Sequence, residues 1–153
     1  MNFLSNVLKI GYLGPGGSYC EMAKDEFLDK YDIYPAEEPF NMISRVVDFV
    51  DNNECTIGVI PLENSIEGTV RESSDTLIKT KNPNIRILSE IIIPINHCLL
   101  SKVTELYSIT GVVSHPQAIA QCHEFISTQL PMNLSIIKAS STAEAARSLD
   151  GYN

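Results

Sequence analysis

The sequence predicts an α/β fold in which mostly parallel strands are flanked by helices. Short apolar runs of strand length alternate with stretches whose apolar residues recur every three or four positions. Parallel neighbours need crossover connections, usually helices, so this alternation favours a parallel sheet over hairpins. Several apolar runs also end in glycine, proline or serine turns that lead directly into a helical pattern.

The first strand and helix are predicted within residues 8–30. The apolar run 8–13 ends at the tight turn Gly14-Pro15-Gly16-Gly17. Ser18 is expected to cap the helix that follows, because its hydroxyl can accept a bond from a backbone N–H of the first turn. The inner face of this helix is expected to hold Tyr19, Met22, Ala23 and Phe27.

Two more strands are predicted at residues 33–36 and 56–61, each followed by a helix. Thr69 and Glu72 have the spacing of a capping box, which predicts a helix over 70–79. The helix between the two strands is expected to start at Asn41 as its cap and to bury Ile43, Val46, Val47 and Val50.

A long β-branched strand is predicted over residues 85–100, interrupted at Pro94 and passing from one sub-domain to another. After it come a helical turn at 104–107, a strand at 109–113, another at 134–137 and a final helix over 142–149. Each prediction rests on apolar runs bounded by polar turns.

The stretch from Ser114 to Cys122 connects the strand at 109–113 to a helix. Pro116 suits the first helical turn, where its missing N–H has no partner to lose. Gln117 and Gln121 are four residues apart, so both face one side, and a different side carries the core stripe Ile119, Cys122 and Ile126. The two glutamines are therefore predicted at the carboxyl end of a strand, where ligands bind open α/β sheets.

The charge distribution excludes a nucleic-acid surface. Lysine and arginine total 11 against 19 acidic residues, and the excess lies mainly in residues 21–54. We interpret these acids as solvated helix faces, since nucleic-acid binding needs a basic patch. The apolar run 91–95 is far shorter than the ~20 residues of a membrane span, so no membrane partner is expected.

The four cysteines, Cys20, Cys55, Cys98 and Cys122, contain no C-x-x-C pair and no metal-ligand spacing. Cys55, Cys98 and Cys122 have apolar surroundings and are expected to be buried thiols. Free thiols and the lack of a secretory signal pattern together predict a cytoplasmic location.

Four polar corners each precede a predicted helix: Gly17-Ser18, Gly68-Thr69, Ser114-Pro116 and Ser140-Thr142. Helix starts present free N–H groups and partial positive charge, which favour carboxylates and phosphates. Each corner alone has an ordinary N-cap as its alternative interpretation. Together with Asn64, Gln117 and Gln121 they favour a site for a small polyanion.

Other candidates are weaker. Glu63 and Glu67 are four residues apart but straddle a loop, so they are a poor catalytic pair. His115 is either a general acid or base or, more simply, a capping residue, and His97 is expected to be a strand histidine with a hydrogen-bond partner. The sequence contains neither G-x-G-x-x-G nor G-K-[ST], which disfavours a nucleotide-binding domain. These candidates also do not form a complete catalytic set.

Five motifs, in order along the chain, resemble the prephenate dehydratase family. They are GPGGSY from Gly14, PLENSIEGTV from Pro61, NHCLL from Asn96, SHPQAIAQC from Ser114 and STAEAA from Ser141. Ser18 stands where threonine is commoner, which keeps the hydroxyl, and Cys20 stands where the family often has a small hydroxyl residue.

The resemblance implies a two-lobed fold like the type 2 periplasmic binding proteins, with the active site in the cleft between lobes. The first lobe would span residues 1–85 and would be incomplete. The second would span residues 86–153, and its last elements could lie beyond Asn153. The implied reaction converts prephenate to phenylpyruvate, water and carbon dioxide in L-phenylalanine biosynthesis. No metal or cofactor is expected, and the full-length protein is expected to be a homodimer.

The family's site residues transfer to matching positions of this sequence. Asn64, Ser114 and Gln121 are implied to contact the substrate. The same cleft would be lined by Gly17, Ser18, Ser65, Gln117, Ser141 and Thr142.

The family's catalytic threonine lies in a Thr-Arg-Phe motif that these 153 residues do not contain. It would lie beyond Asn153, as would the phenylalanine-sensing ACT domain, so little or no dehydratase activity is expected from these residues alone. The alternative is a non-catalytic module of the periplasmic-binding type that binds a small carboxylate.

Overall fold

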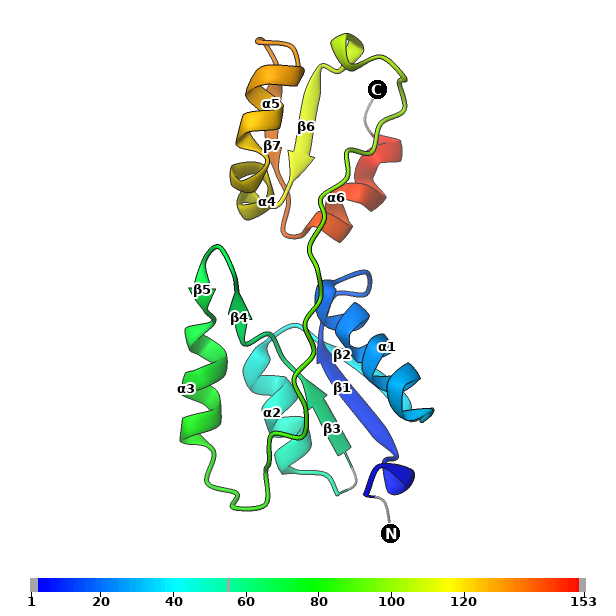
Figure 1. Cartoon of the computed structure of the whole chain (residues 1–153), viewed down its shortest axis with the longest axis vertical. Coiled ribbons are helices and arrows are strands. Elements are labelled where there is room, and N and C mark those ends of the chain that lie inside the picture. Colours follow the sequence, from blue (N-terminus) through cyan, green and yellow to red (C-terminus); the bar gives the residue numbers. More distant parts are fainter. Residues whose placement is uncertain (1–2, 55, 152–153) are drawn as a thin grey trace. The chain divides into compact units, whose positions relative to one another are not determined.

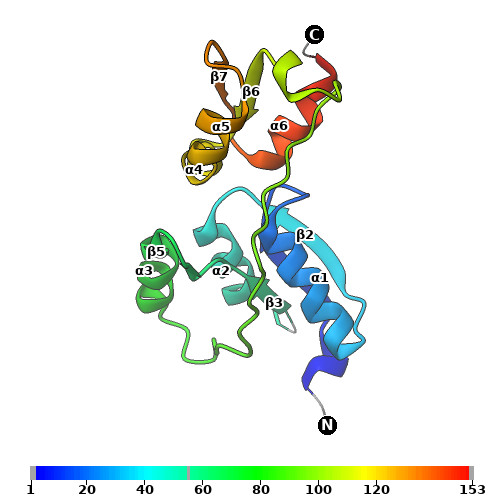
Figure 2. The same cartoon turned by 45° about the horizontal axis from the view of Figure 1, so that its top comes forward.

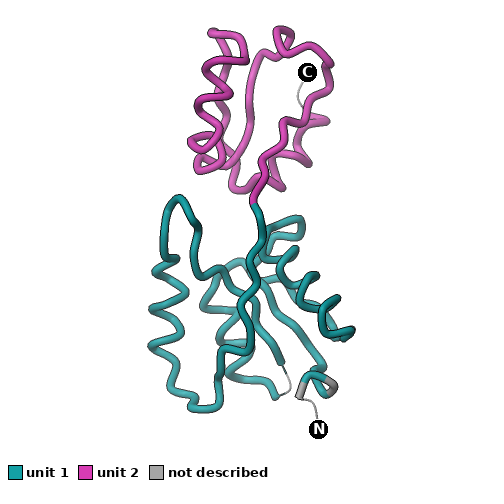
Figure 3. The backbone as a smooth tube through the Cα atoms, in the orientation of Figure 1, with its two compact units in different colours: residues 1–94 teal, residues 95–153 magenta. Residues whose placement is uncertain are grey.

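The computed structural model describes residues 3–54 and 56–151 of the chain, which divide into two compact units (Figure 3). Unit 1 is Met1–Pro94 and unit 2 is Ile95–Asn153. The division falls inside the run 85–100, whereas the sequence placed the end of the first lobe at residue 85. Cys55, expected to be a buried thiol, lies outside the described residues.

The centre of unit 1 is a parallel three-stranded sheet, ordered β2-β1-β3 (Figure 1). The strands are β1 (Lys9–Leu13), β2 (Ala36–Phe40) and β3 (Thr56–Val59). The prediction for the second strand, at 33–36, was too early. Pairing with β1 begins only at Ala36, and because β2 is an edge strand its polar residues need no apolar surroundings.

Two helices cover opposite faces of this sheet, α1 (Tyr19–Tyr31) and α2 (Ile43–Asp51) (Figure 2). From α1, Phe27 and Leu28 join the buried cluster with Ile10 and Ile57. On the other face, a Cβ added to Gly11 would lie 2.8 Å from the Phe49 ring, so glycine permits the close approach of α2.

The start of α2 differs from the prediction. The N-cap is Met42, which makes no side-chain capping bond, rather than Asn41. The core residues Ile43, Val46 and Val47 are buried as predicted, and Val50 is half-buried. Apolar packing against the sheet therefore fixes this helix without a polar cap.

The inner face of α1 also differs. Met22, predicted to face inward, is 49% exposed, whereas Lys24 is only 2% exposed. The Lys24 ammonium forms ion pairs with Glu37 of β2 and with Asp25, at 2.7 Å from Asp25 Oδ1, and lies 5.2 Å from the centre of the Tyr12 ring. A buried lysine persists only where such partners compensate its lost hydration.

The ionisable groups around Lys24 and Tyr12 predict that unit 1 becomes less stable at alkaline pH. Burial, then the bond that Tyr12 donates to Glu21, raise the pKa of Tyr12 from 10.0 to about 12. Burial alone would lower the pKa of Lys24, but bonds and charges from Asp25 and Glu37 raise it above 10.5. For both residues the pKa in the folded state exceeds the pKa in the unfolded state. Their contribution to the unfolding free energy is therefore complete below pH 10 and is lost as the pH rises through the folded-state pKa values.

Tyr12→Phe should therefore flatten the alkaline decline in the unfolding free energy of unit 1, by on the order of 2 to 3 kcal/mol between pH 9 and pH 12. Urea titrations across that range measure it directly. Identical pH slopes for the variant and the wild type would contradict the assignment.

A hairpin follows β3, formed by β4 (Glu63–Asn64) and β5 (Gly68–Thr69), and leads into α3 (Arg71–Lys79). The predicted capping box was wrong. Thr69 belongs to the hairpin, and the N–H of Val70 is bonded to the Leu62 carbonyl at 2.8 Å, so the backbone stays extended up to the helix. The fully buried Ser73 donates to the Pro61 carbonyl and ties α3 to the end of β3.

The run 85–100 is not a strand. The structure assigns no helix or strand to residues 80–105. Ile91 packs against the unit 1 core, while Ile87 and Ile92 are 80% and 78% exposed. The β-branched composition predicted extended backbone, but a strand also needs a hydrogen-bonded neighbour, and none of the ladders in the described residues includes this run.

Unit 2 is built on the parallel pair β6 (Gly111–Ser114) and β7 (Ser135–Lys138). One helix was predicted after Pro116, but there are two, α4 (Pro116–Gln121) and α5 (His123–Gln129), because Cys122 has a ψ of 10°, far from the helical value. The last α-helix of the described residues is α6 (Thr142–Ser148), which confirms the helix predicted over 142–149. The buried apolar residues are Ile109, Ala118, Leu130 and Ala145.

The described residues also contain 3-10 turns at Phe3–Asn6, Leu106–Ser108 and Leu149–Gly151. Cys98 is exposed and Cys122 half-buried, so the expectation of a buried thiol was wrong for Cys98. In the part of the chain that the structure describes, no helix has both the length and the apolar character to span a membrane. Those same residues hold no group of three or more metal-ligating side chains.

Candidate functional site

The candidate residues of unit 1 follow the carboxyl ends of two adjacent strands. Gly17 and Ser18 come after β1, and Asn64 and Ser65 after β3, which pairs with β1. From β1 the chain crosses to β2 on one side of it and then to β3 on the other. Ligands of open α/β sheets bind at this kind of reversal point.

Ser18 and Gly17 are both engaged by the protein itself. Ser18 caps α1 as predicted, since its Oγ accepts from the Glu21 N–H at 3.3 Å and donates to the Leu13 carbonyl at 3.1 Å. The Gly17 N–H, expected to face an anion, donates to the Glu21 carboxylate at 2.5 Å. Glu21 thus fills the anion position at the start of this helix.

Asn64 has its amide orientation fixed by the turn that follows it. Its Oδ1 accepts from the N–H groups of Ile66 and Glu67, at 2.9 and 3.3 Å. Ser65 is exposed beside it, and Gly68 closes the hairpin with a φ of +81°. With the oxygen held by the turn, the Asn64 NH₂ group is the part of the side chain that remains available to a ligand.

The candidate residues of unit 2 also share one strand edge. Ser114 ends β6, and Ser141 follows β7. The Ala139 N–H donates to the Ser114 carbonyl at 2.9 Å, so these two corners are joined. The carboxyl ends of two parallel strands therefore bring Ser114 together with the residues that start α4 and α6.

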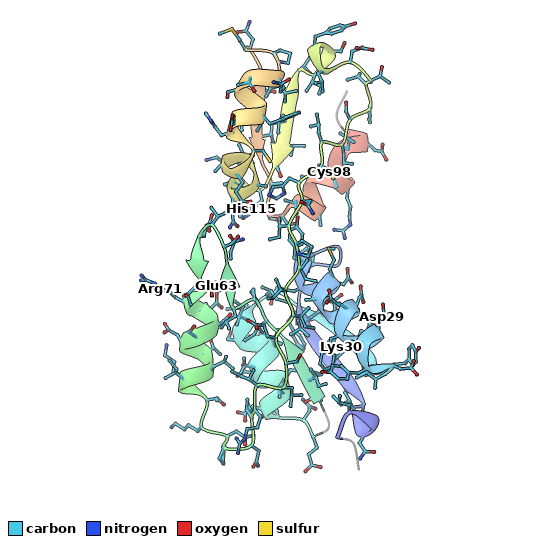
Figure 4. The ribbon with its side chains drawn as sticks, in the orientation of Figure 1. Asp29, Lys30, Glu63, Arg71, Cys98 and His115 are labelled. Atoms are coloured by element: carbon cyan, nitrogen blue, oxygen red, sulfur yellow. The ribbon has the colours of Figure 1, made fainter. Side chains whose placement is uncertain are left out.

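His115 has the capping role that the sequence offered as the simpler of its two interpretations. Its Nδ1 accepts from the Gln117 N–H at 3.3 Å, at the start of α4 (Figure 4). A neutral imidazole with Nδ1 accepting carries its proton on Nε2. Gln117 is half-buried in the first turn of α4.

Gln121 is the last residue of α4 and is held by His97. The Nε2 of His97 lies 2.7 Å from the Oε1 of Gln121, so the hydrogen-bond partner predicted for His97 is confirmed, although His97 does not lie in a strand as predicted. A proton on Nε2 makes His97 the donor and the amide oxygen the acceptor. In Gln121, as in Asn64, the NH₂ group is then the part of the amide that this contact leaves unused.

The start of α6 repeats the arrangement seen at α1. Ser141 Oγ accepts from the Glu144 N–H at 3.0 Å, and the Glu144 carboxylate accepts from the N–H of Ser140 at 2.9 Å and from its hydroxyl. These bonds from Ser140 lower the pKa of Glu144. Thr142 is half-buried in the first turn.

Sequence reasoning did not assign roles to Glu21 and Glu144. Each lies three residues after a capping serine, the spacing of a capping box, and this signal was present in the sequence. The resulting site groups in the described residues are hydroxyls and two oriented amides. Hydroxyl and amide NH₂ groups can donate hydrogen bonds to carboxylate oxygens.

A family model described as prephenate dehydratase matches residues 10–152. A bifunctional chorismate mutase/prephenate dehydratase of Buchnera aphidicola subsp. Schizaphis graminum is 38% identical over 97% of this chain. Prephenate dehydratases of Methanocaldococcus jannaschii and Lactococcus lactis subsp. cremoris are 42% and 32% identical, over 75% and 90% of the chain.

The matched parts are only a portion of these relatives. They cover 37%, 40% and 47% of the three proteins, so the chain corresponds to less than half the length of each. No solved structure matches the chain.

Proposed function

The chain belongs to the prephenate dehydratase family, and from this premise we propose that it forms the substrate-binding part of a prephenate dehydratase. The reaction would convert prephenate to phenylpyruvate, water and carbon dioxide in L-phenylalanine biosynthesis. The observation that carries the proposal is the pair of oriented amides, because Asn64 and Gln121 both present NH₂ donors and prephenate carries two carboxylates.

The proposal includes the assignment of the two units as lobes of a fold like the type 2 periplasmic binding proteins. The remaining contributors would be Gly17, Ser18, Ser65, Ser114, Gln117, Ser141 and Thr142. We place the enzyme in the cytoplasm and, at full length, in a homodimer.

The chemistry of prephenate explains why binding groups are the main requirement. Loss of carbon dioxide and hydroxide makes the ring aromatic, which drives the reaction strongly downhill. The protein has to hold both carboxylates and assist departure of the hydroxyl. Asn64 and Gln121 would meet the first need by donating to carboxylate oxygens, and no residue of this chain is assigned to the second. The relatives are named as dehydratases, which disfavours a non-catalytic carboxylate-binding module.

Prephenate binding to the 153-residue chain tests the proposal. Calorimetry should give a tighter dissociation constant for prephenate than for phenylpyruvate, which has lost the ring carboxylate. In ¹⁵N NMR spectra the side-chain NH₂ signals of Asn64 and Gln121 should shift on addition of prephenate. Absence of binding at millimolar prephenate, or binding without movement of either signal, would contradict the proposal.

A further inference from the structure

We propose that His97 is a positioning residue that orients the Gln121 amide toward the substrate. This inference rests on the proposed function, in which Gln121 contacts a carboxylate. Its physical basis is the 2.7 Å contact between His97 Nε2 and Gln121 Oε1. Both residues belong to unit 2, so the contact lies within one compact unit.

The two ends of a glutamine amide have nearly the same shape but opposite hydrogen-bonding character. A substrate carboxylate accepts from the NH₂ end and is repelled by the oxygen end. Gln121 is the last residue of α4, directly before the break at Cys122. The His97 imidazole holds the oxygen and thereby selects the orientation that presents the donor.

The two proposed amide donors are held in different ways. Asn64 is fixed by backbone N–H groups two and three residues later. Gln121 is fixed by a side chain 24 residues earlier, on a segment without helix or strand. A substitution at His97 can therefore release the Gln121 amide while its backbone stays in place.

His97 is exposed, so its bond with Gln121 is not needed to fill the core. A merely structural role would be seen in the stability of unit 2. A positioning role would be seen in prephenate affinity while stability changes little. The two roles are thus separable by measurement.

The test compares His97→Leu, which has no donor, with His97→Gln, whose Nε2 can donate to the same oxygen. In the 153-residue chain, His97→Leu should raise the prephenate dissociation constant about tenfold, the loss of one ordinary hydrogen bond. His97→Gln should recover most of the affinity. With Gln121→Leu as background, His97→Leu should cost nothing further, since the two residues act through one interaction.

Full prephenate affinity in a folded His97→Leu variant would overturn the inference, as would effects of the two leucine variants that simply add. If the wild-type chain fails to bind prephenate, the proposed function fails instead. The inference still has its own readout in ¹⁵N NMR of the imidazole. A proton on Nε2 is expected, and a neutral ring with its proton on Nδ1 would overturn the inference whatever the binding result.

Discussion

Asn64→Asp is expected to weaken prephenate binding about 100-fold while leaving the fold intact. Aspartate keeps the Oδ1 that accepts from Ile66 and Glu67, so the turn after β4 is preserved. It replaces the NH₂ donor with a second carboxylate oxygen, which repels the substrate carboxylate. Calorimetric titration with prephenate, beside circular dichroism melting, separates the loss of binding from any loss of stability.

The chain contains a matched control. The Oδ1 of Asn82 accepts from the Asn84 N–H at 2.9 Å, a turn of the same kind as that at Asn64 and outside the candidate site. Asn82→Asp adds the same charge to the same kind of turn and should leave prephenate affinity unchanged. Equal losses in the two variants would show that net charge, rather than the Asn64 donor, controls binding.

Ile10→Ala is expected to lower the unfolding free energy of unit 1 by about 4 kcal/mol, since it leaves a cavity in the middle of the sheet. Ile10 is fully buried in β1, the central strand, and forms one cluster with Phe27, Leu28 and Ile57. Urea unfolding followed by hydrogen exchange of unit 1 amides measures the change.

Leu8→Ala serves as the comparison for this core substitution. Leu8 immediately precedes β1 but is 67% exposed, so its truncation should cost less than about 1 kcal/mol. A cost for Ile10→Ala as small as that for Leu8→Ala would show that the sheet repacks around the lost side chain.

Local chemistry explains which parts of the fold were predictable. Ser18 and Ser141 predict helix starts from the sequence alone, because a capping serine acts on the first turn of its own helix. The second strand and the run 85–100 were misread because strand pairing is non-local. The charged edge strand β2 is stabilised by β1, and the β-branched run lacks any such neighbour among the described strands.

The candidate site shows the same distinction. Motifs and strand ends identified Asn64 and Gln121, but not the groups that orient them. The turn holding Asn64 is local, whereas the partner of Gln121 is 24 residues distant, and only a folded chain brings His97 to it. The roles of Glu21 and Glu144 could have been predicted from the sequence, because each lies three residues after a capping serine, the capping-box spacing.

The run 85–100, which pairs with no described strand, is expected to influence aggregation of the chain before it has folded. Ile91, Ile92 and Ile93 are three consecutive β-branched residues that belong to no strand of the described chain, and such residues favour pairing between chains when they are unfolded. Exposed Glu90 and Pro94 bracket them, and a charge and a proline beside an apolar run oppose the addition of further strands. We therefore expect Glu90 and Pro94 to oppose aggregation of the unfolded chain, a role separate from binding and from the core.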